Sequence, residues 1–132
     1  ASKYQVSEVC RFIPYVPHSQ LHQYYAKSDV FVSTSLAETF GIAVREAMAV
    51  GKPVVCTASG GVDDDIFDFN GFKAEIYDYQ AIANAIIAIK TGAVQFNSHK
   101  IRTYVVNKYG REAFLKKMSA VYEDALKTKE RA

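Results

Sequence analysis

Two carboxylates and the short turn between them suggest a chemistry for this sequence. Glu38 and Glu46 are separated by seven residues, and Phe40, Gly41 and Ile42 lie between them. We expect the backbone N–H groups of these three residues to be unpaired donors in the first turn of a helix. A glycine there lets a ligand approach the main chain, and a helix N-terminus favours a phosphate or pyrophosphate. The turn therefore predicts a phosphate-binding site.

The two carboxylates call for a different partner. Glu46 is expected about one and a half turns into the helix, where it would repel a phosphate. Its natural partner is a neutral diol, such as the ribose hydroxyls of a nucleotide, and Glu38 is expected to accept hydrogen bonds from sugar hydroxyls. The alternatives are that Glu46 is an exposed salt-bridge partner and that Glu38 only complements the helix dipole.

A β-turn-α-β unit positions these groups. Residues 29–33 and 53–57 are short apolar runs rich in valine, which predict buried strands. The segment between them contains a helix that we expect to begin near Phe40 and end at Gly51. Strands joined through a helix are parallel, and ligands approach such a sheet at the carboxyl ends of its strands. Glu38 is expected at that edge.

The rest of the chain continues the α/β pattern. We expect further strands over residues 9–13 and 72–77, and helices over residues 19–27, 79–90, 98–108 and 112–127. Cys10 and Cys56 fall in predicted strands, where we expect buried thiols rather than a disulfide. The last helix is predicted to bury one apolar stripe, formed by Phe114, Leu115, Met118, Val121, Tyr122 and Ala125.

Other polar residues near the unit have simpler expected roles. Arg45 points about 100° away from Glu46 on a helix, so we expect a surface residue rather than a phosphate clamp. Three consecutive aspartates at residues 63–65 point in different directions, which favours a solvated face over a Mg²⁺ or Ca²⁺ site. His18 and His22 are four residues apart, but no third ligand is within sequence reach. We therefore predict no metal site.

Several motifs resemble the retaining glycosyltransferases of family 4, which are similar in fold to glycogen synthases. The E-x7-E signature and its continuation match ETFG at residues 38–41, EAMA at 46–49 and GKPVV at 51–55. Weaker matches lie at residues 12–16, 25–32 and 60–61, so that the resemblance covers roughly residues 9 to 90. It implies an α/β fold, a Rossmann-like parallel sheet flanked by helices.

The resemblance covers only the later part of the family's C-terminal domain, one of two. Residues 1–132 are therefore expected to be a single, partial nucleotide-sugar-binding domain, without the N-terminal acceptor domain. Counterparts of two strands of the family's sheet are absent, so another segment fills the gap between residues 8–13 and 29–33, or these two pair directly. The family's phosphate-neutralising Arg and Lys are also absent, and we expect this chain alone to turn over a donor poorly or not at all.

The resemblance also implies roles for the site residues. The amides of Phe40, Gly41 and Ile42 would bind the donor diphosphate, with the Thr39 hydroxyl adding a contact. Glu38 is the expected catalytic residue, which holds the donor sugar at its ring hydroxyls without acting as a covalent nucleophile.

Glu46 would hold the ribose, and Tyr15 and Val16 resemble the loop that lies against the base. Pro14 stands where the family usually has a glycine, which leaves the base loop one backbone donor fewer. Aspartates at residues 63–64 stand where the family has a glutamate. No cofactor is implied, because the nucleotide diphosphate sugar is itself the donor substrate, and no divalent metal is implied, because members of the family with this fold generally work without one.

The implied function is transfer of a sugar from a nucleotide diphosphate to an acceptor hydroxyl, with retention of configuration. The alternative is a non-catalytic nucleotide-binding or regulatory module of the same fold. A dehydrogenase-type dinucleotide domain is disfavoured, because no G-x-G-x-x-G follows a predicted strand.

Composition fits a globular domain of one core. The chain has 132 residues, of which 49% are hydrophobic and 23% charged, and its net charge is +2. This small charge does not favour nucleic acid as a partner. We expect a cytoplasmic protein, with peripheral membrane contact of the full enzyme left open. An unfilled sheet edge would favour dimerisation.

Overall fold

A small parallel sheet forms the centre of the fold. The computed structural model describes residues 2–130 and contains strands β1 (Phe31–Ser33), β2 (Val54–Thr57) and β3 (Gly71–Ala74), in the order β1-β2-β3. Phe31 is paired with Val54, and Val54 with Gly71. The parallel α/β architecture predicted from the sequence is confirmed.

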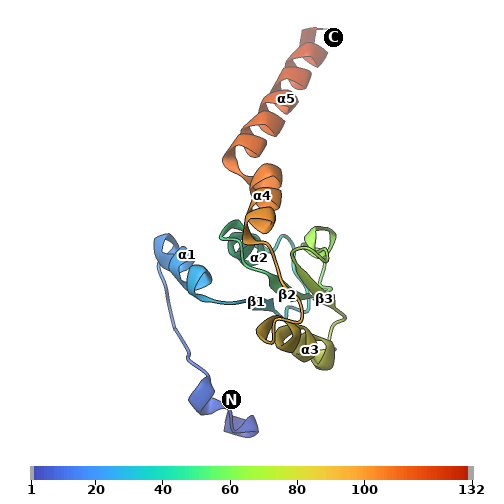
Figure 1. Cartoon of the computed structure of the whole chain (residues 1–132). Helices are drawn as coiled ribbons and strands as arrows, with labels where there is room; N and C mark the ends of the chain where they lie inside the picture. The colour runs from blue at the N-terminus through green and yellow to red at the C-terminus, as the bar shows by residue number, and fades with distance from the viewer. Residues whose placement is uncertain (1, 131–132) are drawn as a thin grey trace.

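Helices cover both faces of this sheet (Figure 1). The α-helices are α1 (His18–Lys27), α2 (Ile42–Ala49), α3 (Tyr79–Lys90), α4 (Ser98–Tyr109) and α5 (Arg111–Glu130), and short 3-10 turns are η1 (Ser2–Tyr4), η2 (Ser7–Val9) and η3 (Asp63–Asp65). Val54 and Cys56 of β2 share one core cluster with Met48 of α2 and Ile101 of α4. Successive strand residues point to opposite faces, and α3 packs against β2 and β3 on the other side.

The N-terminal segment differs from its prediction. Residues 9–13 form no strand; the 3-10 turn η2 ends at Val9, and an extended segment leads from it to α1, apart from the sheet (Figure 1). Cys10 is exposed there rather than buried, whereas Cys56 is buried as predicted. A strand forms only where a neighbour completes its ladder, and β1 is itself a sheet edge here. Residues 9–13 have no such neighbour in the described chain.

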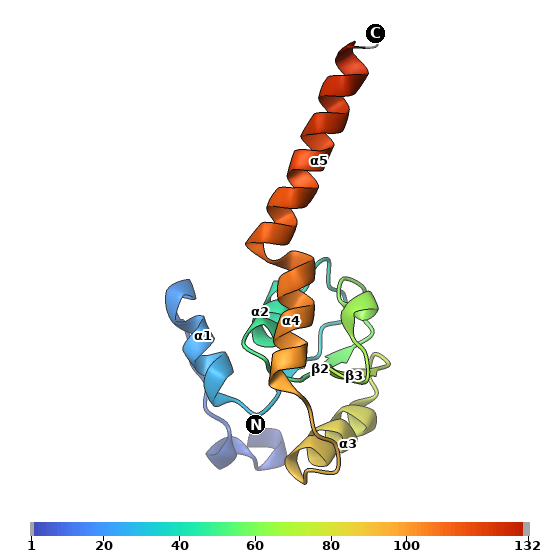
Figure 2. The same cartoon turned by 45° about the horizontal axis from the view of Figure 1, so that its top comes forward.

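The prediction of a buried stripe on the last helix is also wrong. Helix α5 extends away from the sheet, and Figure 2 shows most of its length beyond the other elements. The side chains of Phe114, Leu115, Val121 and Tyr122 are 50% to 64% exposed. Apolar periodicity identifies which face of a helix is hydrophobic but not what covers it. None of the described helices is long and apolar enough to cross a membrane.

Two glycines set the ends of α2. Gly41 precedes the helix with φ of +70°, and Gly51 follows it with φ of +78°, in the left-handed region that glycine adopts without strain. A Cβ at Gly41 would lie 2.1 Å from Cγ1 of Val62. The short α2 therefore begins two residues after Phe40, with no room for a side chain at the turn.

Candidate functional site

The turn that enters α2 is joined to the loop that follows β2. The Glu38 amide donates to the carbonyl of Ser59 over 2.8 Å, and the Gly61 amide donates to the carbonyl of Glu38 over 2.7 Å. These bonds form a parallel bridge between Glu38 and Gly60. Because the turn follows β1 and the loop follows β2, both lie at the carboxyl edge of the sheet, where the sequence predicted the site.

The Glu38 carboxylate lies over the start of α2. Its Oε1 atom accepts hydrogen bonds from the amides of Thr39 at 3.0 Å and Phe40 at 3.3 Å. The amides of Gly41 and Phe40 are the main cause that holds the pKa of the Glu38 carboxyl below its ordinary value. The turn therefore binds an anion, but in this structure the anion is the protein's own carboxylate. A phosphate that used the Phe40 amide would have to displace it.

Glu46 lies on α2 and faces α1. Its carboxylate accepts a hydrogen bond from the Tyr25 hydroxyl at 3.1 Å, and its Oε1 lies 3.6 Å from Nδ1 of His18. Burial and this hydrogen bond raise the pKa of Tyr25 to about 12. The side chain of Glu46 is 27% exposed, so that it remains accessible to a hydroxyl-bearing ligand.

Tyr15 and Val16 lie just before α1, in the extended segment that leads to it. Tyr15 is 80% exposed. The structure thus gathers residues 38–42 in one turn and places Glu46 between that turn and α1. Tyr15 and Val16 are three and two residues before His18, and His18 is what connects their segment to Glu46.

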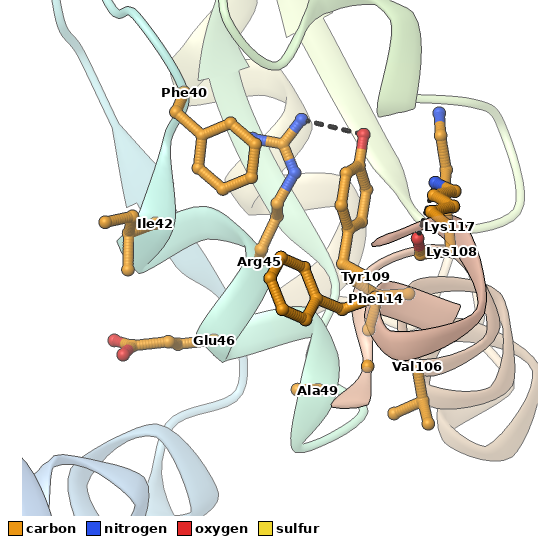
Figure 3. A pocket seen from close by; sticks show the side chains of 12 residues that line it. Phe40, Ile42, Arg45, Glu46, Ala49, Val106, Lys108, Tyr109, Phe114 and Lys117 are labelled. Atoms are coloured by element: carbon orange, nitrogen blue, oxygen red, sulfur yellow. Dashed lines mark hydrogen bonds between the residues drawn. The ribbon is translucent and has the colours of Figure 1, made fainter. Parts of the chain in front are cut away.

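Arg45 is buried, which corrects the prediction of a surface residue. Its Nη2 forms an ion pair with Asp65 and donates to the carbonyl of Gly61 at 3.0 Å and the hydroxyl of Tyr109 at 3.1 Å. The guanidinium also lies between the rings of Phe40 and Tyr109, 4.1 Å and 4.3 Å from their centroids (Figure 3). The rotation of about 100° from Glu46 does turn Arg45 away from it, but toward the protein interior.

Asp65 is buried as well, so the predicted solvated face is wrong at this position. It is 1% exposed and accepts hydrogen bonds from Lys108 at 2.5 Å, Tyr109 at 2.7 Å and Tyr104 at 2.8 Å. Burial raises the pKa of Asp65, but these hydrogen bonds and the charge of Arg45 outweigh it and lower the pKa to about 2. The carboxylate is therefore charged at neutral pH and fully partnered. Sequence reasoning missed this pair because Arg45 and Asp65 are twenty positions apart and neither residue carries a local signal of burial.

A cavity of about 460 Å³ lies beside this network, between α2 and the junction of α4 and α5 (Figure 3). Phe40 and Ile42 line it from the turn, and Tyr109 and Phe114 line it from the other side. Phe40 is 48% and Ile42 63% exposed, so the side chains of the turn face this cavity rather than the core. The turn is thus open toward this cavity.

The fold and the turn together define a parallel α/β domain with an anion-binding helix N-terminus at the carboxyl edge of its sheet. Residues 1–109 match the family described as glycosyl transferases group 1. The chain belongs to this family.

Relatives and a solved structure agree with this assignment. The chain is 33% identical over 87 residues to a D-inositol 3-phosphate glycosyltransferase of Streptomyces griseus, a match that covers 65% of this chain and 18% of that protein. It is 33% identical over 113 residues to O-antigen chain mannosyltransferase B of Escherichia coli, covering 75% and 29%. The structure of a sucrose-phosphate synthase from Thermosynechococcus elongatus superposes with a TM-score of 0.87 at 28% identity, over 96% of this chain and 33% of that one. The chain spans less than a third of the length of the Streptomyces griseus and Escherichia coli relatives.

Proposed function

We propose that this chain is the donor-binding part of a glycosyltransferase of family 4, which transfers a sugar from a nucleotide diphosphate to an acceptor hydroxyl with retention of configuration. The observation that carries the proposal is the turn before α2, whose amides already hold a carboxylate. Amides that align on one anion are suited to another, and a helix N-terminus favours a phosphate oxygen. Membership of the family supplies the nucleotide sugar as the candidate anion.

Donor binding exchanges one anion for another at this turn. The diphosphate takes the amides of Phe40, Gly41 and Ile42, with the Thr39 hydroxyl close by. The carboxylate of Glu38 then leaves the Thr39 and Phe40 amides and accepts hydrogen bonds from ring hydroxyls of the sugar. The exchange keeps one anion on the helix N-terminus, which limits its cost.

The chemical step requires stabilisation of the departing diphosphate and of an oxocarbenium-like sugar. The oriented amides of the turn stabilise the charge that develops on the leaving phosphate. Glu38 orients the sugar as the catalytic residue, and no covalent bond to it is needed. The reaction calls for no cofactor and no divalent metal in this proposal.

Glu46 holds the ribose hydroxyls, and Tyr15 and Val16 lie against the base. The Tyr25 hydroxyl already donates to the Glu46 carboxylate, which leaves its other lone pairs for a diol. Movement of the segment before α1 would bring Tyr15 toward the base. This assignment makes Glu46 a determinant of affinity rather than of the chemical step.

The chain spans less than a third of the length of its curated relatives, so we assign the remaining partners to the part that it does not span. We propose that an N-terminal acceptor domain completes the enzyme and that another segment of the donor-binding domain, or a second copy, pairs with the open edge of β1. The enzyme is expected in the cytoplasm, with peripheral membrane association and without nucleic acid as a partner.

Replacement of Glu46 by alanine tests the nucleotide assignment. We expect the affinity for uridine or guanosine diphosphate to fall about 10-fold or more, because two hydrogen bonds to a charged acceptor are lost. Isothermal titration calorimetry measures this change, with Glu123→Ala on the exposed surface of α5 as the matched control. Equal affinities of wild type and Glu46→Ala would favour a module that binds nucleotides elsewhere or not at all.

A further inference from the structure

A buried polar network lies directly behind the turn. It joins Arg45 of α2, Asp65 of η3 and Tyr109 of α4, and none of these residues is among those assigned to the ligand. Asp65 also holds Lys108 and Tyr104. The network therefore ties α2 and α4 to one carboxylate on η3. Because the network lies beside the turn, it can affect the position of the turn's amides.

Two contacts connect Arg45 to the turn itself. Its Nη2 donates to the carbonyl of Gly61, and the amide of the same glycine donates to the carbonyl of Glu38. Its guanidinium also stacks on the ring of Phe40, whose amide lies on the proposed phosphate site. Arg45 thus contacts both the loop that holds the backbone of Glu38 and the residue that supplies the first amide.

Stability alone does not account for this arginine. Within the described chain, its Nε and Nη1 are buried without a hydrogen-bond partner, which costs free energy. A buried ion pair is weak evidence for stability, since apolar residues of similar volume often serve as well. The planar guanidinium, however, can stack on a ring and donate to a carbonyl at the same time, which an ammonium cannot do.

We propose that Arg45, held in place by Asp65, is a positioning residue that aligns the Phe40–Ile42 amides for the diphosphate by fixing the Gly61 loop and the Phe40 ring. The identity of the ligand rests on the proposed function. Arg45 does not itself touch the ligand. It acts by keeping the anion site formed before the donor arrives, so that binding does not have to order the turn.

Replacement of Arg45 by lysine tests this role, because lysine keeps the charge and loses the planar fork. We expect the affinity for uridine or guanosine diphosphate to fall about 10- to 100-fold, because even a small displacement of the amides weakens a preformed site. We also expect the pKa of Glu38, followed by carbon NMR of its carboxyl group, to rise toward its ordinary value. That rise reports the loss of aligned amides, since the charge of residue 45 is unchanged.

Tyr104→Phe is the matched control. It removes a partner of Asp65 at the far end of the network and leaves the bond from Arg45 to Gly61 in place. We expect it to lower stability but to leave nucleotide affinity and the pKa of Glu38 unchanged. Asp65→Asn serves as a second variant if Arg45→Lys does not fold, and it is expected to behave like Arg45→Lys.

Each outcome decides between the two proposals. A folded Arg45→Lys variant with the wild-type pKa of Glu38 would overturn the positioning role. If neither diphosphate binds the wild type, the proposed function fails, and the pKa of Glu38 alone decides whether Arg45 positions the turn. If Tyr104→Phe lowers the nucleotide affinity as much as Arg45→Lys does, the effect comes from a general loss of stability. That result would contradict the positioning role.

Discussion

Replacement of Asp65 by alanine is expected to lower the free energy of unfolding by about 3 to 5 kcal/mol, the cost of leaving a buried charge unpaired. Arg45 would lose its counter-ion in a site where its side chain is 9% exposed. The hydroxyls of Tyr104 and Tyr109 would lose their acceptor as well. Urea denaturation followed by circular dichroism measures the change. A loss of this size approaches the whole stability of a small domain, so a partly unfolded variant is within the expectation.

Asp64→Ala is the control, because Asp64 is the exposed neighbour of Asp65. We expect it to change stability by less than about 0.5 kcal/mol. The difference between wild type and Asp65→Ala should also depend on pH. Since the pKa of Asp65 is lowered from 3.8 to about 2, its contribution is complete above about pH 4 and is lost as the pH falls toward 2. Equal losses from the two variants would contradict the buried network.

Replacement of Gly61 by alanine is expected to reduce the affinity for uridine or guanosine diphosphate by about 100-fold or more. An added Cβ would lie 2.3 Å from the carbonyl carbon of Thr39 and 2.5 Å from the amide nitrogen of Phe40. These are backbone atoms, so the loop and the turn must separate. The separation breaks the bond from Gly61 to Glu38 and displaces the amides that we assign to the phosphate. Calorimetric titration of the folded variant measures the effect.

Gly92→Ala separates this effect from the general cost of a glycine substitution. Gly92 has φ of +74°, so alanine there is strained, but a Cβ would meet no atom within 4 Å. It follows α3, away from the turn. We expect a small loss of stability and unchanged nucleotide affinity. Wild-type affinity in Gly61→Ala would show that the loop and the turn do not form the binding site.

Local patterns predicted the turn well. The glutamate, the glycine and the start of α2 all depend on neighbours in sequence, and the structure places Glu38, Phe40 and Gly41 in one turn as expected. The helix α3 also has the predicted bounds, because its cap at Asp78 and its apolar stripe are local signals. The alternative that Glu38 complements the helix dipole came from the same local pattern, and in the structure its carboxylate does lie on the Thr39 and Phe40 amides.

Long-range partners account for the errors. The pair of Arg45 and Asp65 spans twenty positions, and neither residue carries a local signal of burial. The strand predicted over residues 9–13 requires a neighbouring strand that the described chain does not contain. The stripe on α5 has the right period, but its cover would have to come from outside the described residues. Each of these cases depends on a partner that periodicity does not reveal.

The central claim is that a nucleotide diphosphate binds the amides that begin α2. An amide-resolved NMR titration of the wild-type chain with uridine and guanosine diphosphates tests it most directly. We expect the signals of Phe40, Gly41 and Ile42 to shift progressively, together with the carboxyl signal of Glu38 as it leaves these amides. Saturating shifts elsewhere in the chain, with these three amides unmoved, would contradict the claim.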